Sequence, residues 1–160
     1  MRFFKKAKDA VDIVRDSIRE TVDPEENESN DDEWIWVKGY KGTHADMICD
    51  PEPGVSMQYE LGKHYVIEGE PKLCENGFHF CMLLEDVLSS FYGSNIISGE
   101  KRNRFFECEA LVRKKDALNY GKIVNGLYSY QVNKLVAKEI VLLQEVSTED
   151  LLDAIHKRGK

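Results

Sequence analysis

The stretch from Leu73 to Tyr92 constrains the fold most, because it changes from a strand pattern to a helix pattern within one segment. Its first half, Leu73–Cys81, predicts an extended segment that turns at Asn76-Gly77, a dipeptide typical of turns. Its second half carries apolar residues three and four positions apart, the spacing of one helix face: Leu84, Val87, Leu88 and Phe91. A strand that runs directly into a helix predicts a domain of mixed α and β structure.

Further strand patterns lie on both sides of this stretch. Trp34–Tyr40 alternates aromatic and aliphatic side chains, which is typical of a strand covered on both faces. Other segments with strand character are Gln58–Leu61, His64–Ile67, Arg104–Val112 and Lys134–Val146, with a weaker one at Asn119–Val124. We expect a loop from Lys41 to about Met57, since Pro51, Pro53 and Gly54 interrupt it.

Helix signals complete the expected fold. The mid-chain helix is predicted at about Leu83–Tyr92, and Ser147-Thr-Glu-Asp150 offers a capping box for a closing helix through Leu151, Leu152 and Ile155. We therefore expect an α+β fold with an antiparallel or mixed sheet, a mid-chain helix and helices at both termini.

The chain divides into three parts. Residues 1–22 predict an amphipathic helix, because Phe4, Val11, Val14 and Ile18 fall on one stripe and Pro24 follows. Residues 23–33 predict an acidic linker with seven acidic residues and no basic one. The formal net charge is −7, and the chain outside this linker has 22 acidic against 22 basic residues. Residues 34–160 are expected to form a single domain.

Candidate partner-binding residues lie in the first two parts. The helix stripe offers an apolar face, and the linker offers negative charge to a basic partner. The residues concerned are Phe4, Val11, Val14, Ile18, Glu25, Glu26, Asp31 and Asp32. A solvated linker and a helix that packs on its own domain or on a second copy explain the same patterns, so both interpretations stay open.

Composition narrows the class of protein. The chain has 160 residues and 18.4 kDa, enough for one domain with a core. Its acidic balance argues against direct binding to nucleic acid, whose phosphates require cations. The first residues lack the apolar segment of a secretory signal, and no apolar run is long enough to span a membrane. We expect a cytoplasmic protein in which all four cysteines stay reduced.

Two groups of residues could carry chemistry. Cys74, His79, Cys81 and Cys108 are of the types that bind zinc, but none has the short paired spacing of structural zinc sites. His79 could also activate a cysteine on a neighbouring strand. Glu107 and Glu109 are two positions apart in a predicted strand, so both side chains point to one face, where they could share a proton. Buried thiols and ordinary strand alternation produce the same patterns, and we expect no catalytic residue, metal or cofactor.

The chain resembles a family of small uncharacterised proteins from bacteriophages, prophages and bacteria. The resemblance runs from about Val37 to Val146, and its most specific part is the Cys-x-x-Gly-Phe-His-x-Cys core at Cys74–Cys81. Relative to that family, Asp50–Met57 is an insertion. The resemblance implies a phage-type accessory protein that binds another protein, of the host, and so inhibits a host defence system.

A second similarity, in layout only, is to ADP-ribosyltransferases. An early strand ends at Tyr40–Thr43, a Gly-Phe-His-Phe segment leads to a helix, and a late strand carries Glu107-x-Glu109. Lys38 or Lys41 stands where that family has Arg or His, and its Ser-Thr-Ser segment is missing. A nucleotide-using transferase is therefore one alternative function. A virion-associated or self-assembling component, associating through the N-terminal helix, is the other.

Overall fold

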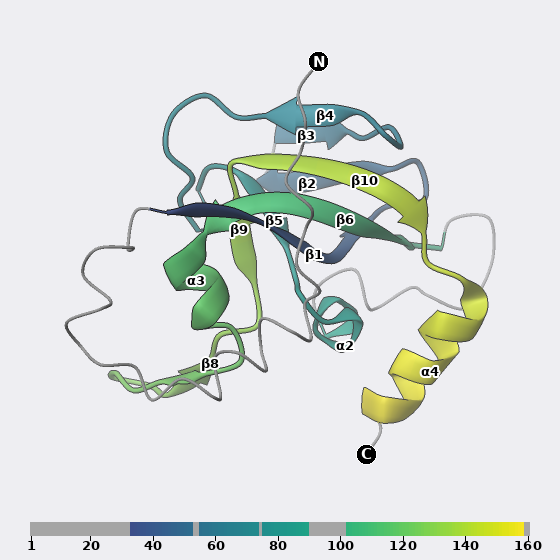
Figure 1. Cartoon of the computed structure of the whole chain (residues 1–160). Coiled ribbons are helices and arrows are strands. Elements are labelled where there is room, and N and C mark those ends of the chain that lie inside the picture. The colour runs from purple at the N-terminus through teal and green to yellow at the C-terminus, as the bar shows by residue number, and fades with distance from the viewer. Residues whose placement is uncertain (1–32, 53–54, 74, 90–101, 159–160) are drawn as a thin grey trace.

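A computed structural model describes residues 33–52, 55–73, 75–89 and 102–158 (Figure 1). The predicted N-terminal helix lies outside these residues, as does the acidic linker apart from Glu33. In chain order the elements are β1 (Trp34–Thr43), β2 (Ile48–Glu52), β3 (Val55–Gln58), β4 (His64–Val66), β5 (Phe78–Phe80), α2 (Leu84–Leu88), β6 (Arg104–Arg113), α3 (Lys114–Leu118), β7 (Ile123–Val124), β8 (Tyr130–Gln131), β9 (Leu135–Ala137), β10 (Glu139–Glu145) and α4 (Thr148–Arg158).

The main sheet has four strands in the order β1-β6-β10-β4. β1 and β6 pair antiparallel over their whole length, from Trp34 opposite Arg113 to Thr43 opposite Arg104. β10 pairs antiparallel with both β6 and β4, and its register with β6 shifts between Leu142 and Gln144. Three small antiparallel pairs, β2-β3, β5-β9 and β7-β8, complete the described β structure. The predicted combination of helices with a mainly antiparallel sheet is confirmed.

The core lies on both faces of β6. Phe106, which is fully buried, faces a cluster formed with the β5-β9 pair, where Phe80 and Leu135 are also buried. Phe105, the preceding residue, points to the other face, because side chains alternate along a strand. There it packs with the buried residues of α2 and α4, which contact each other: Leu84, Val87, Leu88, Leu151 and Ala154. One strand therefore supports two hydrophobic clusters.

The segment between β5 and α2 is hydrogen-bonded to β1 next to Gly39. The Tyr40 amide donates to the Cys81 carbonyl (2.7 Å), and the Cys81 amide donates to the Tyr40 carbonyl (3.0 Å). A Cβ atom on Gly39 would lie 2.5 Å from the Cys81 carbonyl oxygen and 2.6 Å from the Phe80 ring. Only glycine therefore allows the two segments to approach this closely.

Two expectations for strands and loops were wrong. The loop expected from Lys41 to Met57 is in part the end of β1 and in part the β2-β3 hairpin. Pro51 is tolerated in β2 because β2 pairs only with β3 and the register shifts between Cys49 and Glu52, which removes the need for a regular ladder. The strand expected at Gln58–Leu61 is absent, since β3 ends at Gln58 and a turn follows.

The long strand expected at Lys134–Val146 was also wrong, because it is two strands with different partners. β9 pairs with β5, whereas β10 pairs with β6 and β4. The break falls at Lys138, whose amide donates to the Leu111 carbonyl (2.9 Å) and whose carbonyl accepts from the Ile67 amide (3.0 Å). The chain changes sheets at this residue.

The helices agree with expectation only in part. α2 begins at Leu84 and ends at Leu88, and the predicted continuation from residue 90 lies outside the described residues. α4 begins after Ser147, whose hydroxyl accepts from the Asp150 amide (3.1 Å), as the capping pattern predicts. Leu152 points to solvent on this helix, whereas Leu151 is buried. α3 was not predicted. Among the helices that the structure describes, none is long and apolar enough to cross a membrane.

The close approach of the Cys81 carbonyl to Gly39 predicts that a larger residue at position 39 destabilises the fold. The variant Gly39→Ala should lower the free energy of unfolding by about 1–3 kcal/mol, because the added methyl group meets the Cys81 carbonyl oxygen and the buried Phe80 ring. Gly126→Ala is the matched control, since its nearest neighbour is 3.8 Å away, and should change stability by about 0.5 kcal/mol or less. Urea denaturation measures both. Equal stabilities would contradict the close approach.

Candidate functional site

The cysteines that could act as nucleophiles are buried at the junction of β5, α2 and β6. Cys81 follows β5 and Cys108 lies in the centre of β6, with 5% and 1% of their surface exposed. Burial raises the pKa of Cys81 to about 12, and the nearby Asp86 charge adds to this. Burial likewise raises the pKa of Cys108 to about 12. Both thiols are therefore protonated at neutral pH, which makes them poor nucleophiles.

His79 is a poor candidate for the base that would deprotonate one of these cysteines. Its imidazole is half-buried on β5, and its pKa is lowered to about 4, first by burial and then by the charges of Lys41 and Lys134. In the described part of the chain, no group of three or more His, Cys, Asp or Glu side chains could hold a metal ion. Cys74 lies outside that part. Cys108 and Cys81 belong to the two hydrophobic clusters, and His79 lies between the buried Phe78 and Phe80 on β5.

Lys41 is a buried lysine at the end of β1, with 6% of its surface exposed. Its ammonium donates to the His79 carbonyl (2.5 Å) and lies 5.3 Å from the centre of the Tyr59 ring. These contacts attach β1 to β5 and partly replace the water that a charged group loses on burial. Burial, the first of several causes, also raises the pKa of Tyr59.

Glu107 and Glu109 share one face of β6, as the alternation predicts. They lie opposite Tyr40 and Lys38 of β1, and the Gln144 amide donates to Glu107 (2.5 Å). Lys41 lies opposite Phe106 and therefore faces the other side of the sheet. The ladder brings Glu109 together with the exposed Lys38, and it separates both glutamates from Lys41.

A pair of titratable groups, Tyr120 and Asp86, links α2 to the segment before β9. The Tyr120 hydroxyl is in hydrogen-bond contact with the Asp86 carboxyl and lies 3.0 Å from the Asn133 carbonyl oxygen. The Leu83 amide also donates to it, over 3.4 Å. A hydroxyl has one proton, so both acceptors are satisfied together only when Asp86 is protonated and donates to Tyr120. Burial raises the pKa of Asp86 and favours this form, although the hydrogen bond acts in the opposite direction.

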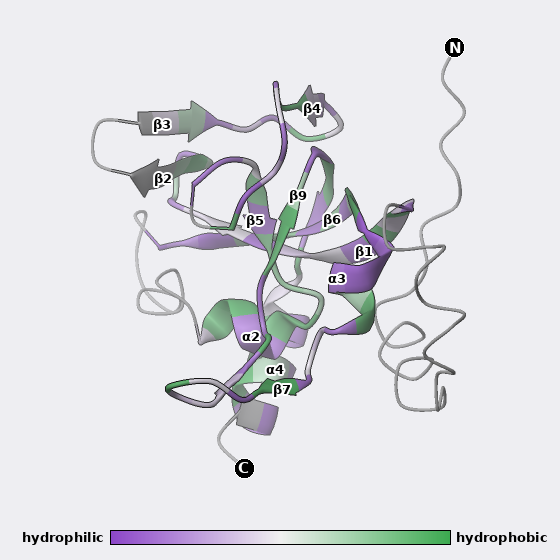
Figure 2. Ribbon diagram, turned by 90° about the vertical axis from the view of Figure 1, so that its left-hand side faces the viewer, coloured by the Kyte–Doolittle hydropathy of each residue, from purple (hydrophilic) through white to green (hydrophobic). Residues whose placement is uncertain are grey.

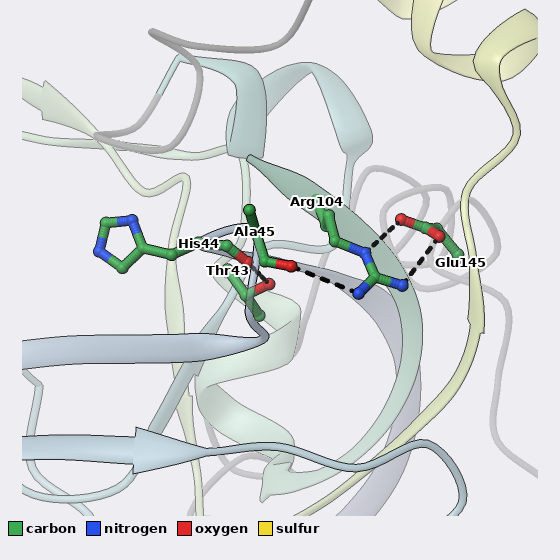
Figure 3. A network of polar contacts seen from close by, with 5 residues as sticks. All are labelled: Thr43, His44, Ala45, Arg104 and Glu145. Atoms are coloured by element: carbon green, nitrogen blue, oxygen red, sulfur yellow. Dashed lines mark hydrogen bonds and ion pairs between the residues drawn. The ribbon is translucent and has the colours of Figure 1, made fainter. Parts of the chain in front are cut away.

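A surface ion pair closes the end of the main sheet. The Arg104 guanidinium bonds both oxygens of Glu145, at 2.8 and 3.1 Å, and a third nitrogen donates to the Ala45 carbonyl over 3.4 Å (Figure 3). Figure 3 shows the His44 ring pointing away from this pair. The contacts join β6, β10 and the turn after β1, and they have the character of a structural clamp.

The four most exposed large apolar residues in the described part of the chain lie on the β7-β8 hairpin, and Val124 of the same hairpin is also exposed. Their exposed fractions are 68% for Ile123, 37% for Val124, 94% for Leu127, 81% for Tyr128 and 60% for Tyr130. Figures 1 and 2 both place this hairpin at the end of the molecule opposite to β3 and β4, and Figure 2 shows its apolar character at β7. A concentration of exposed apolar side chains on one projecting element is typical of an interaction surface.

The sequence predicted a weak strand at Asn119–Val124, which contains β7, but it did not predict β8 or the hairpin. The turn signal Asn125-Gly126 stands between apolar segments and could have indicated a hairpin. The residues predicted to bind a partner, from Phe4 to Asp32, lie outside the described residues and stay a prediction.

Comparison with known proteins gives one match. The model of a family described as a domain of unknown function, DUF7666, matches residues 37–154. The match begins within β1 and ends within α4, so it includes the first part of the closing helix, which the resemblance from Val37 to Val146 does not reach. No curated protein and no solved structure matches the chain.

The Asp86–Tyr120 contact predicts a pH dependence of stability. Because the pKa of Asp86 is raised in the folded state, its stabilising contribution is complete below 3.8, its ordinary value, and is lost as pH rises through the folded-state pKa. Asp86→Asn keeps a donor toward Tyr120 at every pH, so the variant should gain stability relative to the parent as pH rises above about 4. Urea denaturation between pH 3 and 8 measures this difference, and parallel curves would contradict it.

The buried thiols predict selective chemical reactivity. In the folded protein at pH 8, Cys81 and Cys108 should resist a disulfide reagent such as Ellman's, since only a minute fraction is thiolate. Both should react fully in denaturant. Mass spectrometry of modified peptides assigns each site, and rapid labelling of either residue in the native state would show that the cluster opens.

Proposed function

The chain belongs to the DUF7666 family, and since the description of that family assigns no activity, we propose a function from the geometry. We propose that the protein is a non-catalytic protein-binding module and that the β7-β8 hairpin is its contact surface.

The observation that carries this proposal is the exposure of five large apolar side chains within Ile123–Tyr130. Burying one such side chain completely is worth about 1.5–3 kcal/mol, so covering the hairpin would provide a substantial driving force for association. Tyrosine is also enriched among the residues that dominate binding energy at protein interfaces. The hairpin offers two of them, Tyr128 and Tyr130, where solvent can reach them.

The state of the reactive residues supports a non-catalytic role. The ammonium of Lys41 bonds a backbone carbonyl, and Cys81 and Cys108 are protonated in the interior. Glu109, which an ADP-ribosyl transfer would need close to a cation in the site, faces Lys38 on the other side of the sheet from Lys41. These side chains pack or form bonds within the fold. We therefore assign the function to the surface of the protein.

The biological setting of the proposal rests on the resemblance to phage and prophage proteins. We place the chain among phage-type accessory proteins, with a host protein as its partner and inhibition of a host defence as its effect. The acidic residues between Asp23 and Glu33 extend this proposal, because they could occupy a basic channel of such a partner.

Site-specific photo-cross-linking tests the proposed surface. The full chain, carrying benzoylphenylalanine in place of Tyr128, should form a discrete adduct with one protein in cells. The same cross-linker in place of Leu61 is the matched control and should not form it. Leu61 is 50% exposed and belongs to the connection between β3 and β4, two strands that Figure 1 places at the end of the molecule opposite to the hairpin.

A double variant tests whether the apolar side chains themselves make the contact. It combines Ile123→Ser with Leu127→Ser and keeps Tyr130 as it is. With the cross-linker at position 128, this variant should reduce the adduct by about tenfold or more, since two apolar contacts are lost. Equal adducts from positions 61 and 128, or none at 128, would reject the hairpin as the contact surface.

A further inference from the structure

We infer that the partner presents an apolar cavity with an acidic rim, and that Leu127 and Tyr128 enter this cavity while Lys122 and Lys134 face the rim. This inference rests on the proposed function and adds the chemistry of the partner. It comes from the distribution of exposure and charge along the hairpin.

The two most exposed apolar side chains of the hairpin lie at its tip, ahead of Ile123 (68%) and Tyr130 (60%) in its strands. Val124, in β7, is 37% exposed, whereas Leu127 and Tyr128, in the connection between the strands, are 94% and 81% exposed. The largest apolar surface is therefore at the far end of a narrow projection. A projection with an apolar tip is complementary to a concave surface, as are the aromatic anchors that fill pockets at protein interfaces.

The charge near the hairpin is positive. Residues 114–134 contain four lysines, Lys114, Lys115, Lys122 and Lys134, and one acidic residue, Asp116. Lys114 is paired with Glu33 (3.4 Å), whereas Lys122 and Lys134 are exposed, and within the described chain neither is at ion-pair distance from a carboxylate. These two lysines stand where the hairpin begins and shortly after it ends.

The base of the hairpin holds the tip in place. The Gly121 amide donates to the Val132 carbonyl (2.7 Å), and the Val132 amide donates to the Lys122 carbonyl (2.9 Å). Gly121 has a φ of +82°, a conformation that favours glycine. The Gln131 side chain donates to the Gly121 carbonyl (2.9 Å), and the Ser129 hydroxyl donates to Asn125 (3.1 Å) across the turn. A preformed projection loses less conformational entropy on binding than a free loop does.

An apolar tip with a basic base matches an apolar cavity with an acidic rim. Complementary charges at the edge of an interface mainly raise the association rate, while the apolar centre determines the lifetime of the complex. An anionic membrane is a weaker match, because surface recognition of anionic lipid usually takes clusters of about four to eight basic residues. Of the four lysines between residues 114 and 134, Lys114 is already paired with Glu33, which leaves fewer basic residues than such a cluster has.

Zero-length cross-linking tests the acidic rim. Cells expressing the full chain with benzoylphenylalanine at position 128 yield the covalently captured partner, and a carbodiimide is then added to the captured complex. This reagent joins an amine to a carboxylate only when the two are in contact. We expect peptides that join Lys122 and Lys134 to Asp or Glu of the captured protein. Lys63, exposed near β4 and paired with Glu60, is the control and should form no link to that protein.

The outcomes separate this inference from the proposed function. Capture at position 128 without links from Lys122 or Lys134 would overturn the acidic rim and leave the contact surface standing. Absence of capture would overturn both. Capture of a second copy of this chain, or binding to phosphatidylserine vesicles that is lost in Leu127→Ser, would overturn the inferred partner.

Association kinetics with the captured partner, once purified, provide the second readout. The variant with Lys122→Glu and Lys134→Glu should associate about tenfold more slowly at low salt, with a smaller difference at high salt. Lys63→Glu should leave the rate unchanged. A charge variant that associates at the parent rate at low salt would overturn the inference.

Discussion

The ladder between β1 and β6 is the interaction on which the rest of the structure depends. It is unbroken from Trp34 opposite Arg113 to Thr43 opposite Arg104, and the other layers attach to one of its two strands. β10 pairs along β6, and Cys81 bonds the free edge of β1 at Tyr40. Because Phe105 and Phe106 are buried on opposite faces, this strand pair also joins the two hydrophobic clusters.

Patterns within a single segment of the sequence predicted some of the strands and helices correctly. The alternation in Arg104–Val112 indicated β6, and the Ser147 cap indicated the start of α4. The break at Lys138 could not be predicted, since apolar strand-forming residues stand on both sides of Lys138-Glu139 and the two strands differ in their pairing partners. Pro51 predicted a loop for a similar reason, because the sequence does not show that β2 pairs on one side only.

The same limit applies to the candidate site, where the sequence shows the residue types but not their environment. Sequence reasoning identified Cys81, Cys108 and His79 as possible reactive groups, but their reactivity depends on burial and on neighbouring charges, which only the fold supplies. The exposure of the hairpin could not be predicted for the same reason. Leu127 and Tyr128 have the composition of core residues, and nothing in the sequence distinguishes an apolar residue inside the protein from one at its surface.

The hydrogen bonds between Gly121 and Val132 have a consequence for how such a protein can change. They hold the two ends of the hairpin together. The hairpin can therefore change in length and in the residues at its tip without moving the strands that precede and follow it. None of its exposed apolar residues belongs to either hydrophobic cluster. Under the proposed function, partner choice and fold stability therefore reside in separate residues, and natural variation could retarget this surface while the β1-β6 framework stays the same.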